Sequence, residues 1–254
     1  MSFSADIKEE LSHPSSAGRH CRLAETAAVL SICGKIIITE NNHYCVKIQT
    51  ENLPVARKYF TLLRKAFNIR AEVAVRKSRE ARFYSVVVRR DREARRLLSE
   101  THLLDADGNI QECMSPIHNR LLKQNCCRRA FIRGAFLAAG SVSDPEKSYH
   151  FEIVCSSDEK ARQLQVLLGQ YGIDARIVLR KRHHVVYVKE GSQIVELLGL
   201  MGAHVSLMQL ENVRIVKEVR NTVNRKVNCE TANLNKTVAA AVRQAEDIRY
   251  IETR

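Results

Sequence analysis

Two stretches of this chain, RLAETAAVLSICG at residues 22–34 and RRAFIRGAFLAAG at residues 128–140, share one design. Each is a run of mostly small residues that ends in glycine, the residue that most often follows the last turn of a helix. Beyond each glycine, the same succession of strand and helix patterns follows. Because a repeat of this kind usually determines the architecture, the sequence predicts two similar halves.

Each half reads as helix, two strands, helix, two strands, helix. In the first half, hydrophobic spacing and turn signals predict helices at 22–33, 53–67 and 92–104 and strands at 35–39, 44–50, 71–77 and 83–90. In the second half they predict helices at 128–139, 158–171 and 192–200 and strands at 141–143, 149–155, 175–182 and 184–189. The fold class is therefore α+β, a duplicated αββαββα domain.

The repeat divides the chain into five segments. They are an N-terminal helix and connection (1–19), repeat 1 (20–108), an inter-repeat linker (109–127), repeat 2 (128–202) and a helical extension (203–254). In the extension, a helix at about 205–219 leads into an Asn-rich stretch, where we expect turns and helix caps, before a last helix.

The charge balance favours a polyanionic partner. The chain has 41 Lys and Arg against 28 Asp and Glu, a formal net charge of +13, and the basic residues gather between residues 64 and 96. Such an imbalance is typical of nucleic-acid-binding proteins, and a basic surface that is merely solvated is the alternative.

Eight cysteines and an N-terminus with acidic rather than apolar residues predict a soluble protein of the reducing cytoplasm. No stretch is long and apolar enough to predict a membrane span. Cys21, Cys126 and Cys127 begin the two equivalent helices, yet no Cys-x-x-Cys pair and no His at regular zinc spacing accompany them. The sequence therefore favours free thiols, with neither metal nor cofactor.

Two small-residue helices that pack closely about a pseudo-two-fold axis resemble the LAGLIDADG homing endonuclease scaffold in its single-chain form, over about residues 20–200. In those enzymes a saddle of two sheets straddles DNA, and a carboxylate before each helix-terminal glycine holds the metal. Here Cys33 and Ala139 occupy these positions, and neither can ligate Mg²⁺ usefully. The resemblance therefore implies the scaffold without the enzyme.

A literal LDADG at residues 104–108 offers a rival metal position. The segment before it is charged and long-chained, so it could not form a close helix pair, and no second copy exists to share a metal. We interpret it as a turn after a helix.

The stretches CCRRAFIRGAFLAAGSV (126–142), VRIV (213–216) and NRKVNCETANLNK (224–236) together resemble the WhiA family. These are bacterial DNA-associated regulators of sporulation and cell division, in which a degenerate LAGLIDADG domain is tethered to a C-terminal helix-turn-helix module. The resemblance implies double-stranded DNA and other regulatory or division proteins as partners, nucleoid association, and roles in chromosome segregation and developmental transcription. Since this chain stops at Arg254, we expect that module to be absent, which leaves a truncated chain and a short relative as alternatives.

Strand alternation selects the candidate DNA contacts. With Tyr44, Val46 and Ile48 in the core, Lys47 and Gln49 face outward. By the same logic Arg76, Arg180 and Arg182 lie opposite core-facing Val75, Ile177 and Leu179. The full candidate set is Lys47, Gln49, Arg76, Lys77, Arg180, Arg182, Asn224, Arg225, Asn228 and Lys236. Contacts from such side chains would be mostly to phosphate.

The second repeat carries a feature against DNA binding. It places His150 and Glu152 where the first repeat has Cys45 and Lys47, and a carboxylate on a phosphate-facing strand would repel DNA. Despite this carboxylate, the net positive charge and the resemblance to the WhiA family favour a non-catalytic DNA-binding regulator. A metal-dependent endonuclease and a protein-interaction scaffold with an incidental basic surface are the alternatives.

Overall fold

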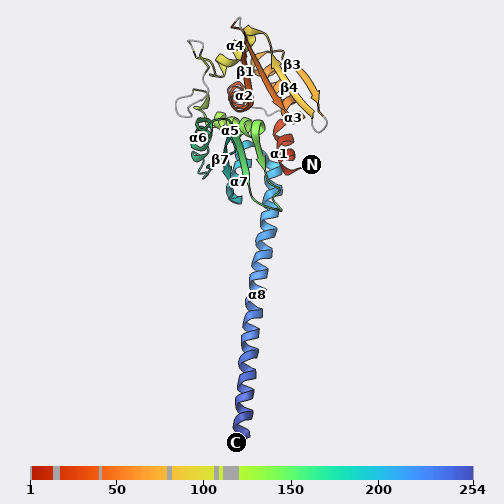
Figure 1. Cartoon of the computed structure of the whole chain (residues 1–254), viewed down its shortest axis with the longest axis vertical. Coiled ribbons are helices and arrows are strands. Elements are labelled where there is room, and N and C mark those ends of the chain that lie inside the picture. The colour runs from red at the N-terminus through yellow and green to blue at the C-terminus, as the bar shows by residue number, and fades with distance from the viewer. Residues whose placement is uncertain are drawn as a thin grey trace. The chain divides into compact units, whose positions relative to one another are not determined.

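The computed structural model describes residues 2–13, 18–39, 42–78, 82–105, 109–110 and 120–253. Cα packing divides the chain into residues 1–209 and residues 210–254. The first unit holds both repeats (Figure 1).

The first unit opens with α1 (Phe3–Ser12), and repeat 1 follows as α2 (Arg19–Cys33), β1 (Gly34–Ile38), β2 (Tyr44–Thr50), α3 (Leu53–Phe67), β3 (Glu72–Lys77), β4 (Arg82–Val88) and α4 (Asp91–Glu100). After the 3₁₀ turn η1 (Arg120–Leu122), repeat 2 comprises α5 (Asn125–Ala139), β5 (Gly140–Val142), β6 (Phe151–Cys155), α6 (Asp158–Gly169), β7 (Arg176–Arg180), β8 (His183–Val188) and α7 (Gly191–Met201). The predicted order of elements is confirmed.

Each repeat builds a four-stranded antiparallel sheet. Sheet 1 has the order β1-β2-β4-β3, and sheet 2 has the matching order β5-β6-β8-β7. The identical strand order in both halves is the duplication that the repeated sequence predicts. In Figure 1, α2 and α5 lie together in the middle of this unit, with β1, β4 and α4 of repeat 1 above them and β7 and α7 of repeat 2 below.

The close contact of α2 with α5 depends on small residues. Ala24, Ala27 and Ala28 of α2 are fully buried. On the facing helix, a Cβ added to Gly134 would lie 2.4 Å from the carbonyl oxygen of Glu25. The two backbones therefore approach to a distance that only glycine at position 134 permits, because any side chain would displace the opposing backbone.

Gly34 and Gly140 end the two helices without the left-handed conformation that a helix-terminal glycine often adopts. Both have extended backbone, with φ of −71° and −86°, and pass directly into β1 and β5. The need for glycine is steric here, since a Cβ at Gly34 would lie 2.4 Å from the carbonyl oxygen of Leu30.

The last helix, α8 (His204–Glu252), is continuous. Its first turn belongs to the first unit, where the carboxylate of Glu10 accepts hydrogen bonds from the backbone N–H groups of Val205 and Ser206 at 2.8 and 3.0 Å. An acid at this end satisfies N–H groups that a helix leaves unpaired and suits its dipole.

The expected turns in the Asn-rich stretch are wrong, because residues 220–236 are helical throughout. Residues 203–254 contain neither Gly nor Pro, and Asn lowers helix stability only modestly relative to Ala. The hydroxyl groups of Thr222 and Thr237 donate to carbonyl oxygens four residues earlier, at 2.9 and 3.0 Å. The polar groups of this stretch are thus accommodated without a break.

No helix among the described residues is both long and apolar enough to cross a membrane.

Candidate nucleic-acid interface

The candidate interface begins on β2, where alternation separates core from surface. Tyr44, Val46 and Ile48 are at most 4% exposed, which confirms their predicted core positions. Lys47 lies between Val46 and Ile48, and Gln49 follows Ile48, so the side chains of Lys47 and Gln49 leave the opposite face of the sheet.

Strand register gathers three predicted residues on this open face. Lys47 pairs with Val87 and Gln49 with Ser85, both on β4, while β3 places Ala74 opposite Ser85. Arg76 lies two residues along β3 from Ala74 and therefore on the same face. Lys47, Gln49 and Arg76 line a single groove of about 390 Å³, here called the sheet 1 groove.

The positive charge of the sheet 1 groove is only partly neutralised. Arg89, at its border, donates to Glu72 at 2.6 Å, and this hydrogen bond raises the pKa of Arg89. Lys35 pairs with Lys47 across β1 and β2 and so shares the face. Within the described part of the chain, no ion pair joins Lys35, Lys47 or Arg76 to an acid. These three cations remain available to an outside anion.

One candidate contact on β3 lies apart from the groove, and one expectation about this strand needs correction. Lys77 follows Arg76 directly and pairs with Arg82, so it leaves the other face of the sheet and lies outside the groove. Val75, expected in the core, is 61% exposed. β3 is the outermost strand of sheet 1, and the strand alternation cannot reveal how far the covering helices extend.

The outer strand of sheet 2 also exposes a residue that was expected in the core. Leu179 of the outer strand β7 is 63% exposed rather than buried, and Ile177 is half-buried. Arg182 is not in a strand, because Arg180 pairs with His183 and leaves Lys181 and Arg182 as a two-residue turn. The positive φ of Lys181, 58°, is typical of such hairpin turns.

Glu152 does lie on the open face of sheet 2, where it pairs with Ser141, but its charge is compensated. Its carboxylate lies 3.4 Å from Nη1 of Arg180 and 3.1 Å from Nε2 of His150, and it accepts a hydrogen bond from the Ser141 hydroxyl at 3.1 Å. Arg180 therefore already pairs with an acid of its own sheet. The open face of sheet 2 carries less available positive charge than the sheet 1 groove.

The candidates of the extension lie on exposed turns of α8. Asn221, Asn224, Asn228 and Asn235 follow one another at spacings of three, four and seven residues, which places them on one face of the helix. Arg225 and Lys236 flank this row. The result is a polar and basic stripe rather than a set of caps.

The positions that hold metal in the endonuclease scaffold do not fit one here. The thiol of Cys33 donates to the carbonyl oxygen of Val29 at 3.2 Å, and burial raises its pKa to about 12. Ala139 offers no donor atom. A neutral thiol and a methyl group cannot supply the oxygen ligands that Mg²⁺ requires. Of the rival LDADG, Leu104 and Asp105 follow the end of α4, and Asp107 lies outside the described residues.

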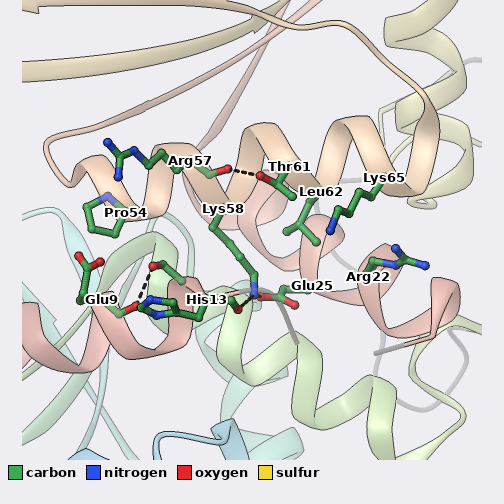
Figure 2. A pocket seen from close by; sticks show the side chains of 11 residues that line it. Glu9, His13, Arg22, Glu25, Pro54, Arg57, Lys58, Thr61, Leu62 and Lys65 are labelled. Carbon is green, nitrogen blue, oxygen red and sulfur yellow. Dashed lines mark hydrogen bonds and ion pairs between the residues drawn. The ribbon is translucent and has the colours of Figure 1, made fainter. Parts of the chain in front are cut away.

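A separate pocket of about 280 Å³ lies between α1, α2 and α3 (Figure 2). Lys58 extends from α3 to its floor and donates to the carbonyl oxygens of Leu11 and His13 at 3.2 and 3.0 Å. Arg57 and Lys65 also line it. None of the predicted DNA contacts lines this pocket.

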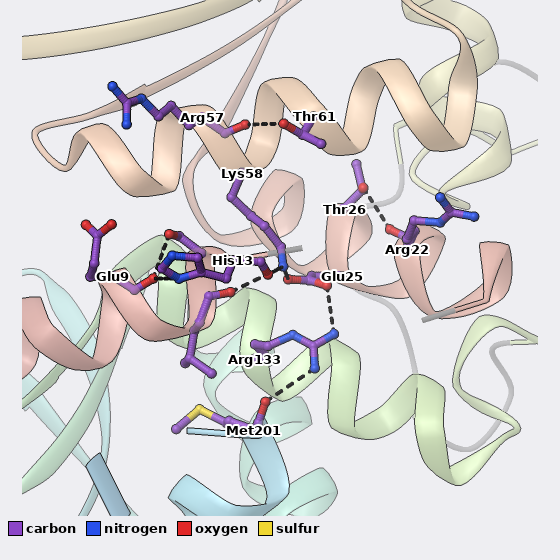
Figure 3. A network of polar contacts seen from close by, with 12 residues as sticks. Glu9, His13, Arg22, Glu25, Thr26, Arg57, Lys58, Thr61, Arg133 and Met201 are labelled. Carbon is purple, nitrogen blue, oxygen red and sulfur yellow. Dashed lines mark hydrogen bonds and ion pairs between the residues drawn. The ribbon is translucent and has the colours of Figure 1, made fainter. Parts of the chain in front are cut away.

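Beneath the pocket, Glu25 joins three helices through buried charges (Figure 3). Its carboxylate lies 3.4 Å from Lys58 of α3 and 2.8 Å from Arg133 of α5, and its side chain is 1% exposed. Burial lowers the pKa of Lys58, and the charge of Glu25 opposes that effect. Arg133 donates to the carbonyl oxygen of Met201 at 3.3 Å. The network therefore joins α2 and α3 of repeat 1 to α5 and α7 of repeat 2.

Comparison with known proteins identifies the family. The family model described as the WhiA N-terminal LAGLIDADG-like domain matches residues 19–104, and that of the WhiA LAGLIDADG-like domain matches residues 128–220. A "Probable cell division protein WhiA" from Lachnoclostridium phytofermentans is 52% identical over 99% of this chain and 81% of its own length. The chain belongs to the WhiA family. A relative of the same name from Alkaliphilus oremlandii is 45% identical over 99% of this chain and 80% of its own length.

A third WhiA model, that of the C-terminal HTH domain, matches residues 223–254. The match begins inside α8 and includes Asn224, Asn228 and Asn235 of the polar stripe. As far as the structure describes this segment, to residue 253, it is helix without an internal turn until Thr253.

Solved structures support the fold. Full-length DUF199/WhiA from Thermatoga maritima superposes with a TM-score of 0.73 at 21% identity, over 96% of this chain and 77% of that one. The homing endonuclease I-DmoI in complex with its target DNA gives a TM-score of 0.51 at 12% identity, over 72% of this chain and 96% of that one. The chain thus shares the endonuclease scaffold, as its paired helices predict.

Proposed function

We propose that this protein is a non-catalytic, double-stranded DNA-binding regulator of cell division. The observation that carries the proposal is the joint placement of Lys47, Gln49 and Arg76 in the sheet 1 groove, with Lys35 beside them and no acid paired to the three cations among the described residues. Lysine and arginine side chains on an open sheet provide phosphate contacts, which give affinity and salt dependence.

The comparisons support the division role. The WhiA relatives are named probable cell division proteins, and the HTH family match covers the end of α8. Asn224 and Asn228 of the polar stripe, with the flanking Arg225 and Lys236, are the second proposed contact. We extend the proposal to sporulation, chromosome segregation and transcription regulation, to regulatory or division proteins as further partners, and to nucleoid association in the cytoplasm.

The absence of catalysis belongs to the proposal as well. A nuclease on this scaffold would need carboxylates at positions 33 and 139, where the chain has a thiol and a methyl group. The protein would then hold DNA in the saddle without cleaving the backbone.

One experiment separates this proposal from its two alternatives. Binding of a labelled duplex is measured by fluorescence anisotropy over a salt series, and supercoiled plasmid is incubated with the protein and Mg²⁺. We expect binding that weakens steeply with salt and no nicking. Nicking that Asp107→Ala abolishes would establish the endonuclease, and failure to bind duplex at low salt would establish the scaffold.

A further inference from the structure

Four metal-ligating side chains meet where the two repeats join. His20 and Cys21 lie in the first turn of α2, and Cys126 and Cys127 lie in the first turn of α5. Cys21 and Cys127 each precede the glycine that ends their helix, Gly34 or Gly140, by the same number of residues. The pseudo-two-fold arrangement therefore brings two equivalent dipeptides face to face.

Distances among these side chains approach those of a tetrahedral site. Nδ1 of His20 lies 3.1 Å from Sγ of Cys127, 3.3 Å from Sγ of Cys21 and 3.9 Å from Sγ of Cys126. All four ligand atoms lie within 4.8 Å of one another. Zinc bonds of roughly 2.0–2.3 Å in a tetrahedron separate neighbouring ligand atoms by about 3.5–3.8 Å. Small side-chain rotations would complete this geometry.

The surroundings fix which histidine nitrogen faces the thiols. A Cβ added at Gly18 would lie 2.8 Å from Nε2 of His20, so the far edge of the imidazole ring lies over that glycine. Nδ1 is left pointing at the three sulfur atoms. The ring position is the one that a metal ligand through Nδ1 would need.

Charge also favours an ion among the thiols. Zinc ligation requires cysteine in its thiolate form, and a divalent cation placed among three sulfur atoms stabilises that form. Because the site lies at two helix N-termini and near Arg133, the net negative charge of three thiolates on one divalent ion is compensated.

We propose that His20, Cys21, Cys126 and Cys127 form a structural zinc site that joins the two repeats. One imidazole and three thiolates are the ligands that zinc prefers over Mg²⁺ or Ca²⁺, which take oxygen. All four positions come from the protein, so the site is closed to substrate and its role is a cross-link. His20 and Cys126 are exposed and give the ion a path of entry.

This site is separate from the metal positions of the endonuclease scaffold. Cys33 and Ala139 end the same two helices that the cluster begins. A fifteen-residue helix is about 22 Å long, so the two locations lie at opposite ends of the helix pair. The proposal is independent of DNA binding.

Metal analysis tests the proposal directly. Protein purified with a reductant and loaded with ZnCl₂ is freed of excess metal, and its zinc content is measured by mass spectrometry. In parallel, Co²⁺ is added to metal-free protein and visible absorption is recorded. We expect one zinc ion per chain, together with the thiolate charge-transfer and strong d–d bands of tetrahedral cobalt.

Two double variants provide the comparison. Cys126→Ser with Cys127→Ser removes two ligands and should abolish zinc retention, the tetrahedral cobalt bands and the fall in melting temperature that a chelator causes in the parent protein. Cys45→Ser with Cys229→Ser removes two thiols elsewhere and should keep all three properties. Should the first variant fail to fold, His20→Ala replaces it, because this exposed side chain contributes no core packing.

The proposal would be overturned by zinc-loaded parent protein that retains no stoichiometric metal, by an octahedral cobalt spectrum, or by equal metal retention in the site and control variants. A disulfide between Cys21 and Cys127 that persists under reductant and prevents metal uptake would count against it equally.

Discussion

The backbone of Gly134 in α5 packs against the carbonyl oxygen of Glu25 in α2, at a distance that leaves no room for a methyl group. Glu25 is also the residue whose carboxylate bridges Lys58 and Arg133. The same helix turn therefore sets both the closest approach of the repeats and their buried charge balance.

We expect Gly134→Ala to destabilise the protein by about 1–3 kcal/mol, because the added methyl group forces two backbones apart. Chemical denaturation monitored by circular dichroism measures the change. Gly169→Ala is the matched control, since its Cβ would meet no atom within 4 Å and alanine is the better helix former. Equal destabilisation by both variants would show that the close approach of α2 and α5 does not cause the loss of stability.

Glu25→Gln should cost about 3–5 kcal/mol of unfolding free energy, because it leaves two buried cations without their counter-charge. Adding Lys58→Met to that variant should restore part of the loss. Glu100→Gln removes an acid whose partner, Arg19, is 58% exposed, and we expect at most about 1 kcal/mol from it. Similar losses at positions 25 and 100 would refute the buried network as a stabilising feature.

Asp91 should make stability depend on pH in the acid range. It accepts the Tyr44 backbone N–H at 2.7 Å and an Arg95 hydrogen bond at 2.9 Å, and the first of these is the main reason that its pKa is lowered. A lowered folded pKa gives stabilisation that is present above the unfolded value, about 3.9, and is lost as pH falls through the folded one.

Unfolding curves at several pH values between 2 and 6 therefore separate Asp91→Asn from the parent. The variant should lose stability near neutral pH and show a weaker decline in acid. Asp174→Asn, whose nearest cation lies 3.8 Å away, should keep the parent profile. A variant profile parallel to that of the parent would contradict the role given to Asp91.

Much of the fold could be predicted because its signals are local. The small residues before Gly34 and Gly140 predict the helix pair, and alternation in β2 separates Val46 from Lys47. The exposure of Val75 could not be predicted, since position in the sheet decides it rather than sequence spacing. The continuity of α8 runs against the prediction from Asn density, because the lack of Gly and Pro leaves no residue that breaks the helix.

The cluster of His20 with three cysteines was missed for another reason. Its ligands come from two repeats and lack the spacing of a contiguous zinc motif. A signal was nevertheless present, since Cys21 and Cys127 occupy equivalent positions and a pseudo-two-fold axis brings such positions together.

The central claim is that cations of the sheet 1 groove neutralise DNA phosphates, and the salt dependence of duplex binding tests it most directly. The slope of log K against log salt is measured for the parent, for Lys47→Gln with Arg76→Gln, and for Arg57→Gln with Lys65→Gln, which carries the same charge change on α3. We predict that the groove variant loses about two units of slope and that the α3 variant keeps the parent slope within about half a unit. Equal slopes for the two variants would contradict the claim.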